Sequence, residues 1–393
     1  MSSNSPDASQ PTSSGEFEFT DPERYDDVDR KHRRLAELLV AKRLDAWLLQ
    51  TPANFSWLTS GAPCPQSNPG QSTAALFLTA DARVVAANNI DASFLFDRKL
   101  GGLGFQLKQR AWHEPREVLL ADLCRGRKVA VDCHSAAALV SGIYLADSVL
   151  PLRRTLGPIE RERMRKLGQE VAHSVEATAR NVELGDTEAE INAQLAHRLL
   201  RREVDPVHLR ACVDGRTAAY RHGTGGASEM KRCVMISATG SRDGLHCTAT
   251  RTVLFGLPTG GFVEAFHKST MLCATGMHFT QSGLMFRDIW PKVKRIYEKQ
   301  NLVDEWRLAD QAEVTGYRPC ETLLTPDCDV VIEPHMAIFW HPSVAGAMVG
   351  DTMLVTDEGF ELVTPASDWP LITVTVKGEA ISLPDLLVRP SSG

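Results

Sequence analysis

The sequence predicts a two-domain protein of the α+β class, in which a smaller α/β domain precedes a larger α+β domain. Short apolar strands alternate with helices in the first part of the chain, a pattern typical of α/β domains. In the second part, amphipathic helices come before long strands, which favours an α+β domain. The pair Gly157-Pro158 separates the two patterns. We therefore expect domains over residues 30–156 and 158–393.

The first 29 residues are expected to form a disordered acidic tail. They hold eight acidic residues and one basic residue, together with many Ser and Pro. Such segments bury too little apolar surface to offset their ordering entropy. Because the whole chain has a formal net charge of −6, the rest of it is close to neutral. A general nucleic-acid-binding protein would carry a strong basic excess, so we expect no nucleic-acid partner.

The α/β domain is predicted to begin with a helix at Arg30. Leu35, Leu38 and Leu39 repeat there at helical spacing, with basic residues on the other face. Short apolar runs bounded by polar residues then predict strands. These strands are expected at residues 46–49, 74–78, 83–87 and 128–131.

The α+β domain is predicted to open with two helices. Met164, Leu167 and Val171 form an apolar stripe at three- to four-residue spacing, which indicates an amphipathic helix. A capping box at residues 187–190 predicts the start of the second helix, because Thr187 and Glu190 can satisfy each other's backbone amides.

After the second helix the apolar period changes to that of strands. The turn at residues 241–244 predicts a hairpin. The remaining elements follow from the same patterns. They are hairpin strands at 233–238 and 245–255, helices at 262–281 and 286–300, and strands at 330–332, 337–340, 353–355 and 371–376.

The chain is expected to be a cytoplasmic protein without a membrane partner. No apolar run approaches the ~20 residues of a membrane span. The N-terminus lacks the basic and apolar regions of a signal peptide. The nine cysteines are odd in number and contain no CxxC pair, so reduced thiols are expected rather than a disulfide or zinc framework.

Several short strings, in this order along the chain, resemble a known enzyme family. The stretch from Pro158 to Leu200 resembles the opening of the pita-bread fold, which creatinase, aminopeptidase P, prolidase and methionine aminopeptidase share. Residues 34–61 are similar to the creatinase and prolidase N-terminal domain. The resemblance covers about residues 30–365. Its remaining strings are Leu184-Gly185-Asp186-Thr187-Glu188, Arg221-His222-Gly223, Asp243-Gly244, Ile332-Glu333-Pro334 and Asp351-Thr352-Met353-Leu354.

Peptidases of this family hold two metal ions with two Asp, one His and two Glu. On the resemblance, only one of these five positions keeps its ligand, Glu333. A dinuclear hydrolase needs several hard carboxylate ligands, so we expect neither a family-type metal site nor any other cofactor. The positions fall at Ser237, Thr248, Asp310, Glu333 and Gly350.

The resemblance then points to creatinase, a metal-free member that hydrolyses a small C–N bond. Its proton-shuttling histidine is matched by His222 and one of its glutamates by Glu333, whereas Thr250 and Gly350 replace the others. His222 stands in a glycine-rich loop that lets the backbone approach a ligand closely, and an ordinary histidine pKa suits proton transfer near neutral pH. We expect His222 as the catalytic acid/base and Glu333 as an electrostatic anchor.

Other polar residues are expected to bind the substrate. Arg221 and Arg251 are candidates for a carboxylate, which guanidinium groups bind through two hydrogen bonds. Asp310 and Glu313 could each supply a carboxylate for acid/base work or for an ammonium group. The vacated metal cavity is expected to be lined by Ser237, Thr248 and Thr250.

Two histidines follow Glu333 with the same parity. His335 would share its strand face with Glu333 and reach the same cleft. His341 lies six residues further along, roughly 20 Å on a strand, so it should not join that cluster without a bend. A single-metal site built from His222, Glu333, His335 and Asp310 remains an alternative.

Three functions remain open at this stage. The first is a metal-independent, creatinase-like enzyme that cleaves a C–N bond of a small nitrogenous molecule. The second is a non-catalytic binding protein that kept the fold, and the third is a metal-dependent Xaa-Pro-type aminopeptidase with substitute ligands. The resemblance also implies a homodimer in which the N-terminal domain of one subunit lines the partner's cleft.

Overall fold

The computed structural model describes residues 21–68, 71–221, 223, 225–258 and 260–391. The chain divides into two compact units, Met1–Tyr144 and Leu145–Gly393. The division comes before the predicted boundary at Gly157-Pro158, because helix α6 (Ala146–Arg154) belongs to the second unit. Arg153 of this helix is buried and forms an ion pair with Glu321 of the same unit.

The first unit is built on a six-stranded mixed sheet in the order β6-β5-β4-β1-β7-β8. Every strand predicted in this region is present within one residue of its expected bounds. The strands are β1 (Ala46–Leu49), β4 (Ala75–Leu78), β5 (Arg83–Asn88), β6 (Gln106–Arg110), β7 (Val129–Val131) and β8 (Ile143–Tyr144), with a small hairpin of β2 (Gln66–Asn68) and β3 (Gln71–Ser72). The helices are α1 (Pro22–Lys42), α2 (Pro52–Leu58), α3 (Asn89–Ser93), a π-helix (Phe94–Lys99), α4 (Arg116–Cys124) and α5 (His134–Val140).

Helix α1 begins at Pro22, eight residues before the predicted start at Arg30. The Asp21 side chain caps the helix by accepting a hydrogen bond from the backbone of Arg24 at 3.1 Å. Asp27 is buried and lies 2.6 Å from Nζ of Lys31, one helical turn away. Its charge therefore belongs to a buried ion pair and not to a tail. Residues 1–20 of the predicted tail lie outside the described residues.

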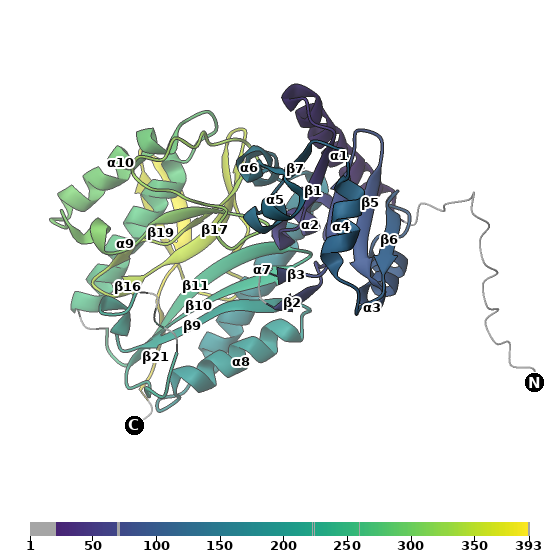
Figure 1. The fold of residues 1–393 in the computed structure, drawn as a ribbon. Helices are drawn as coiled ribbons and strands as arrows, with labels where there is room; N and C mark the ends of the chain where they lie inside the picture. Colours follow the sequence, from purple (N-terminus) through teal and green to yellow (C-terminus); the bar gives the residue numbers. More distant parts are fainter. Residues whose placement is uncertain (1–20, 69–70, 222, 224, 259, 392–393) are drawn as a thin grey trace, which may run out of the picture. The chain divides into compact units, whose positions relative to one another are not determined.

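The second unit is built on a nine-stranded sheet whose main path runs β13-β12-β14-β17-β11-β10-β9. Figure 1 shows β9, β10 and β11 side by side in this sheet. Neighbours on this path are antiparallel. The path strands are β9 (Asp205–Val213), β10 (Cys233–Arg242), β11 (Leu245–Phe255), β12 (Ala312–Thr315), β13 (Thr322–Leu323), β14 (Ala337–Trp340) and β17 (Gly350–Thr356). Two further strands lie off this path: β18 (Gly359–Leu362) pairs with β17, and β21 (Leu387–Arg389) pairs with β11. Two small hairpins complete the strands: β15 (Ser343–Val344) with β16 (Ala347–Met348), and β19 (Leu371–Val376) with β20 (Glu379–Pro384).

Four helices of this unit match the predicted ones: α7 (Pro158–Asn181), α8 (Glu188–Leu200), α9 (Gly260–Phe279) and α10 (Phe286–Lys299). At two places the sheet and these helices approach so closely that only glycine fits. A Cβ at Gly240 of β10 would lie 2.7 Å from the Val171 side chain of α7, and one at Gly276 of α9 would lie 2.5 Å from the Trp340 ring of β14. One face of the sheet thus packs on helices, and the alternate residues of each strand point the other way. None of the described helices is long and apolar enough to cross a membrane.

Candidate active site

The register of the second unit's sheet places polar residues in two rows on the face away from the helices. In the first row, Arg210 of β9 pairs with Ser237 of β10, Ser237 with Thr250 of β11, and Thr250 with Gly350 of β17. Directly paired residues of neighbouring strands point to the same face. The Thr250 hydroxyl donates a hydrogen bond to Ser237 Oγ at 2.9 Å.

The second row lies two residues along on each strand. His208 pairs with Thr239, and Thr239 with Thr248. The hydroxyl oxygens of Thr239 and Thr248 are 2.8 Å apart and share a hydrogen bond. The hydroxyl groups of both rows therefore satisfy one another, as buried polar groups must.

Strands β12 and β14 extend this face with acidic and aromatic residues. Glu313 of β12 pairs with Phe339 of β14, and Phe339 pairs with Thr352 of β17. His341 follows β14 directly and donates its backbone N–H to the carbonyl of Gln311. Its ring stacks on Phe339 with the two centroids 4.6 Å apart.

A cavity of about 180 Å³ opens on this face of the sheet. Its residues come from β9, β10, β11, β12, β14 and the loops that flank β12. It is lined by His208, Arg210, Ser237, Thr239, Thr248, Asp310, Glu313, Pro319, Cys320, Phe339 and His341.

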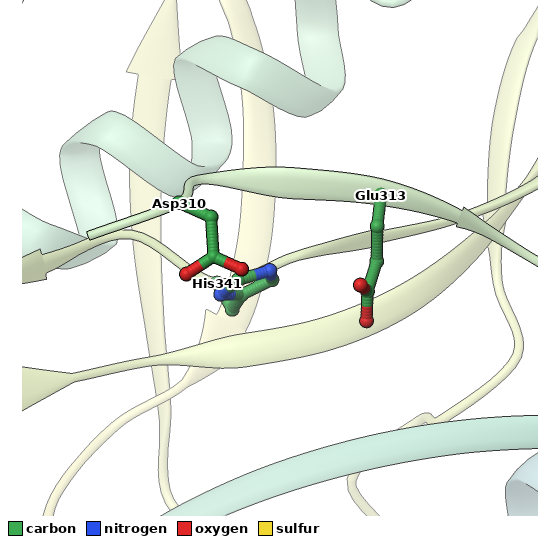
Figure 2. A group of neighbouring side chains, drawn as sticks. All are labelled: Asp310, Glu313 and His341. Carbon is green, nitrogen blue, oxygen red and sulfur yellow. The ribbon is translucent and has the colours of Figure 1, made fainter. Parts of the chain in front are cut away.

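Three of these side chains form the acid–histidine cluster of the site, defined as Asp310, Glu313 and His341. Figure 2 shows the Asp310 carboxylate beside the His341 ring, with the Glu313 side chain extending in the same direction from β12. One ligand atom from each residue lies within 4.8 Å of the others. Among the described residues, this is the one group of three or more His, Cys, Asp or Glu side chains with that spacing.

Burial in the cavity changes the acidity of the cluster. It raises the pKa of Glu313 to about 7, with a smaller contribution from the nearby Asp310 charge. A hydrogen bond with Cys320 and the charge of Arg210 act in the opposite direction. Burial beside Glu313 likewise raises the pKa of the Cys320 thiol to about 12. Glu313 is therefore able to exchange a proton near neutral pH, whereas Cys320 stays a thiol.

The structure brings part of the predicted site together. Ser237, Thr248 and Asp310 line the cavity, and Thr250 is joined to it through Ser237. Arg221 does not line it and instead binds Glu305 at 2.9 Å. His222, the predicted acid/base, lies outside the described residues.

Arg251 lies on the opposite face of β11 from Thr250, away from the cavity. It is therefore not placed to bind the carboxylate of a substrate there, as the sequence analysis expected. Its side chain is fully buried. Nε is 3.1 Å from Glu176 and Nη1 is 2.8 Å from Asp351. The guanidinium is thus a structural part of the core.

Glu333 and His335 also lie outside the cavity, because the chain forms a turn before β14 where a strand was expected. Glu333 is exposed and accepts a hydrogen bond from the Thr155 hydroxyl at 2.8 Å. His335 has a left-handed backbone (φ 71°) and its ring contacts Arg161. The residue that reaches the acid–histidine cluster is His341, which the parity argument had kept apart from Glu333.

The site does not fit the dinuclear metal centre of the family's peptidases. The positions expected to carry its aspartates are Ser237 and Thr248. Both side chains line the cavity as neutral hydroxyls, and each shares a hydrogen bond with a threonine of its own row. At Gly350, a Cβ would lie 2.8 Å from two ring carbons of Phe339 and 3.1 Å from Thr250 Oγ1. Phe339 therefore occupies the space that a ligand side chain at this position would need.

Replacing Gly350 by glutamate is expected to lower the free energy of unfolding by about 2 kcal/mol or more, because overpacking forces Phe339 from its place. Urea denaturation measures the loss. Combined with Phe339→Ala, the glutamate should cost much less than it does alone, since directly packed residues couple. A Gly350→Glu protein as stable as the parent chain would show that this position is not filled.

Sequence reasoning missed Arg210, Cys320 and His208 and kept His341 apart from the site, whereas it offered Glu313 together with Asp310 as a possible carboxylate. A local signal existed for β9, where His208 and Arg210 alternate with the apolar Val207 and Leu209. Such alternation predicts that the two polar side chains share a face. Nothing in the sequence shows that this face meets β12.

Comparison with known proteins agrees with the fold. Residues 162–357 match metallopeptidase family M24. The Xaa-Pro dipeptidase from Bacillus anthracis has a TM-score of 0.76 at 15% identity, over 92% of this chain and 100% of that chain. The prolidase from Pyrococcus horikoshii has a TM-score of 0.74 at 13% identity, over 86% and 99%. An aminopeptidase P structure from Escherichia coli has a TM-score of 0.69 at 16% identity, over 86% and 94%.

No curated protein matches the chain in sequence. The solved structures share its fold at low identity, and the family match covers α7 to β17 except for the first four residues of α7. This confirms the predicted pita-bread fold. The chain belongs to metallopeptidase family M24, the pita-bread family of C–N bond hydrolases.

Proposed function

We propose that the chain hydrolyses a C–N bond of a small nitrogen-containing substrate in the 180 Å³ cavity, without a metal ion, as creatinase-like enzymes do. The proposal rests on the state of the Glu313 side chain in this cavity. It is a carboxyl group with a pKa of about 7 in a cavity whose two expected aspartate positions are the hydroxyls of Ser237 and Thr248, while Phe339 fills the space at Gly350. Family membership supports C–N hydrolysis as the reaction class.

A general acid/base works best when its pKa is close to the operating pH. In the proposed reaction, ionised Glu313 accepts a proton from water, and the oxygen of that water forms a bond to the substrate carbon. The protonated carboxyl then donates the proton to the nitrogen as the C–N bond breaks, so that the carboxylate is regenerated. Asp310 and His341 adjoin Glu313 and are proposed to stabilise the developing positive charge on the nitrogen.

Of the two residues that the sequence analysis expected to be catalytic, His222 is still a prediction and Glu333 is left out of this proposal. His222 stays a prediction from the family resemblance, since it lies outside the described residues. Glu333 has no part in this proposal because it is exposed and bonded to Thr155. The homodimer and the cytoplasmic location also remain proposals that the resemblance and the cysteine pattern support.

The acid–histidine cluster favours a second candidate, a metal-dependent hydrolase with substitute ligands. Two carboxylates and an imidazole with ligand atoms within 4.8 Å of one another are a donor set suited to one divalent cation. Asp310, Glu313 and His341 would hold such an ion, which would polarise a substrate oxygen or activate water.

Metal analysis combined with chelation separates the two candidates. We expect purified protein to hold well under one equivalent of divalent metal and to keep its hydrolytic rate, measured on a panel of small amides, amidines and dipeptides, after dialysis against EDTA. A stoichiometric metal content with loss of hydrolysis on chelation would favour the metal-dependent enzyme. Binding without any turnover would favour a non-catalytic protein.

A further inference from the structure

Arg210 differs from the arginines that the sequence suggested for substrate binding. It lines the cavity from β9, on the same sheet face as its partner Ser237. Within the described part of the chain, its guanidinium forms no hydrogen bond and no ion pair within 4.0 Å. By contrast, Arg221 is bound to Glu305 and Arg251 to Glu176 and Asp351.

The cavity therefore has two poles of opposite charge. The positive pole is Arg210, with His208 two residues away on the same face. The pKa of His208 is lowered by burial and by Arg210, so this ring is neutral at physiological pH and adds no charge. The negative pole is formed by Asp310 and Glu313, and the neutral hydroxyls of Ser237, Thr239 and Thr248 lie on the sheet between the two poles.

We propose that Arg210 binds a carboxylate of the substrate and so sets which end of the molecule meets Glu313. This inference rests on the proposed function for the place of the chemistry. A guanidinium with free N–H groups binds a carboxylate through two parallel hydrogen bonds. Seated on Arg210, a substrate with a carboxylate at one end presents its scissile nitrogen to the acidic pole.

The cavity volume limits the length of that substrate. The volume of about 180 Å³ is below the roughly 300 Å³ at which pockets for drug-sized ligands begin. The class that fits is a small N-substituted amino acid, such as an N-acyl or N-carbamoyl glycine, and not a dipeptide with two large side chains.

Matched pairs of ligands test the inference. The probes are N-acetylglycine, N-carbamoylglycine and sarcosine, each compared with its carboxamide, in thermal-shift and calorimetric titrations of the full chain. We expect at least one acid to stabilise the protein while its amide does not. In Arg210→Met the dissociation constant of that acid should rise about tenfold or more. Arg210→Lys should give an intermediate value, because it keeps the charge but loses the planar fork.

Two control variants separate this inference from the proposed function. Arg201→Met, an exposed arginine outside the cavity, should bind like the parent chain. Glu313→Gln should still distinguish acid from amide, even though it no longer hydrolyses the substrate. Equal binding of acid and amide in every pair, or an unchanged constant in Arg210→Met, overturns the role of Arg210. Undiminished hydrolysis by Glu313→Gln overturns the proposed function instead.

Discussion

Replacing Arg251 by methionine is expected to lower the free energy of unfolding by about 3–5 kcal/mol, the usual cost of removing one partner from a buried ion pair. Methionine keeps much of the side-chain volume but leaves the carboxylates of Glu176 and Asp351 without their cation. The change also removes the hydrogen bonds that Arg251 donates to the carbonyls of Thr250 and Thr364. Urea denaturation at pH 7 measures the loss.

The loss should depend on pH in a defined direction. Burial already raises the pKa of Asp351, and the Arg251 charge opposes that rise. Without the cation the pKa rises further, so the variant takes up protons more readily and its deficit should be smaller at pH 5 than at pH 8. Arg201→Met is the matched control, since Arg201 is exposed. A loss as small as that of the control would mean that Arg251 is free, as a substrate-binding residue would be.

Replacing Glu313 by glutamine is expected to slow hydrolysis by about 10²–10⁴-fold, the contribution of a general acid/base. The parent rate should rise with pH through about 7, because only the ionised carboxylate accepts the proton from water, and then level off. The variant should lose this inflection. Steady-state rates between pH 5 and 9 on the best substrate of the panel provide the measurement, with the exposed Glu162→Gln as the control.

A stability measurement guards against simple misfolding of the Glu313 variant. The pKa of Glu313 is raised in the folded chain, so ionising it disfavours the folded state, and stability falls as pH rises from the ordinary glutamate pKa to about 7. Glutamine removes that loss. The variant should therefore be at least as stable as the parent at pH 8, gain much less at pH 5, and gain nothing below the ordinary glutamate pKa. A slow but also unstable variant would not support catalysis by Glu313.

The elements that the sequence predicted well are those whose signal is local. The strands β1, β4, β5 and β7 are short apolar runs, and α7 and α8 carry complete apolar stripes. The hairpin of β10 and β11 follows from one turn between two long strands. Ser237, Thr248 and Thr250 were expected in the cavity from the family resemblance, and the uninterrupted register of that hairpin places all three on one face.

The residues that were misplaced depend on contacts between distant segments. Glu333 and His341 have the same parity, but the turn at His335 breaks the strand on which that parity depended. Arg251 carries no local sign that Glu176, 75 residues earlier, lies beneath it. Glu313 was offered as a site carboxylate together with Asp310, but its place beside His341 depends on the pairing of β12 with β14, whose register is set by tertiary packing.

The ring of Phe339 above Gly350 also bears on any redesign of the cavity. A carboxylate at Gly350 requires a smaller residue in place of Phe339, and that second change would itself open a void and remove the ring stacked on His341. Each of the two substitutions is unfavourable alone, so a designed carboxylate at this position has to be introduced together with the smaller residue.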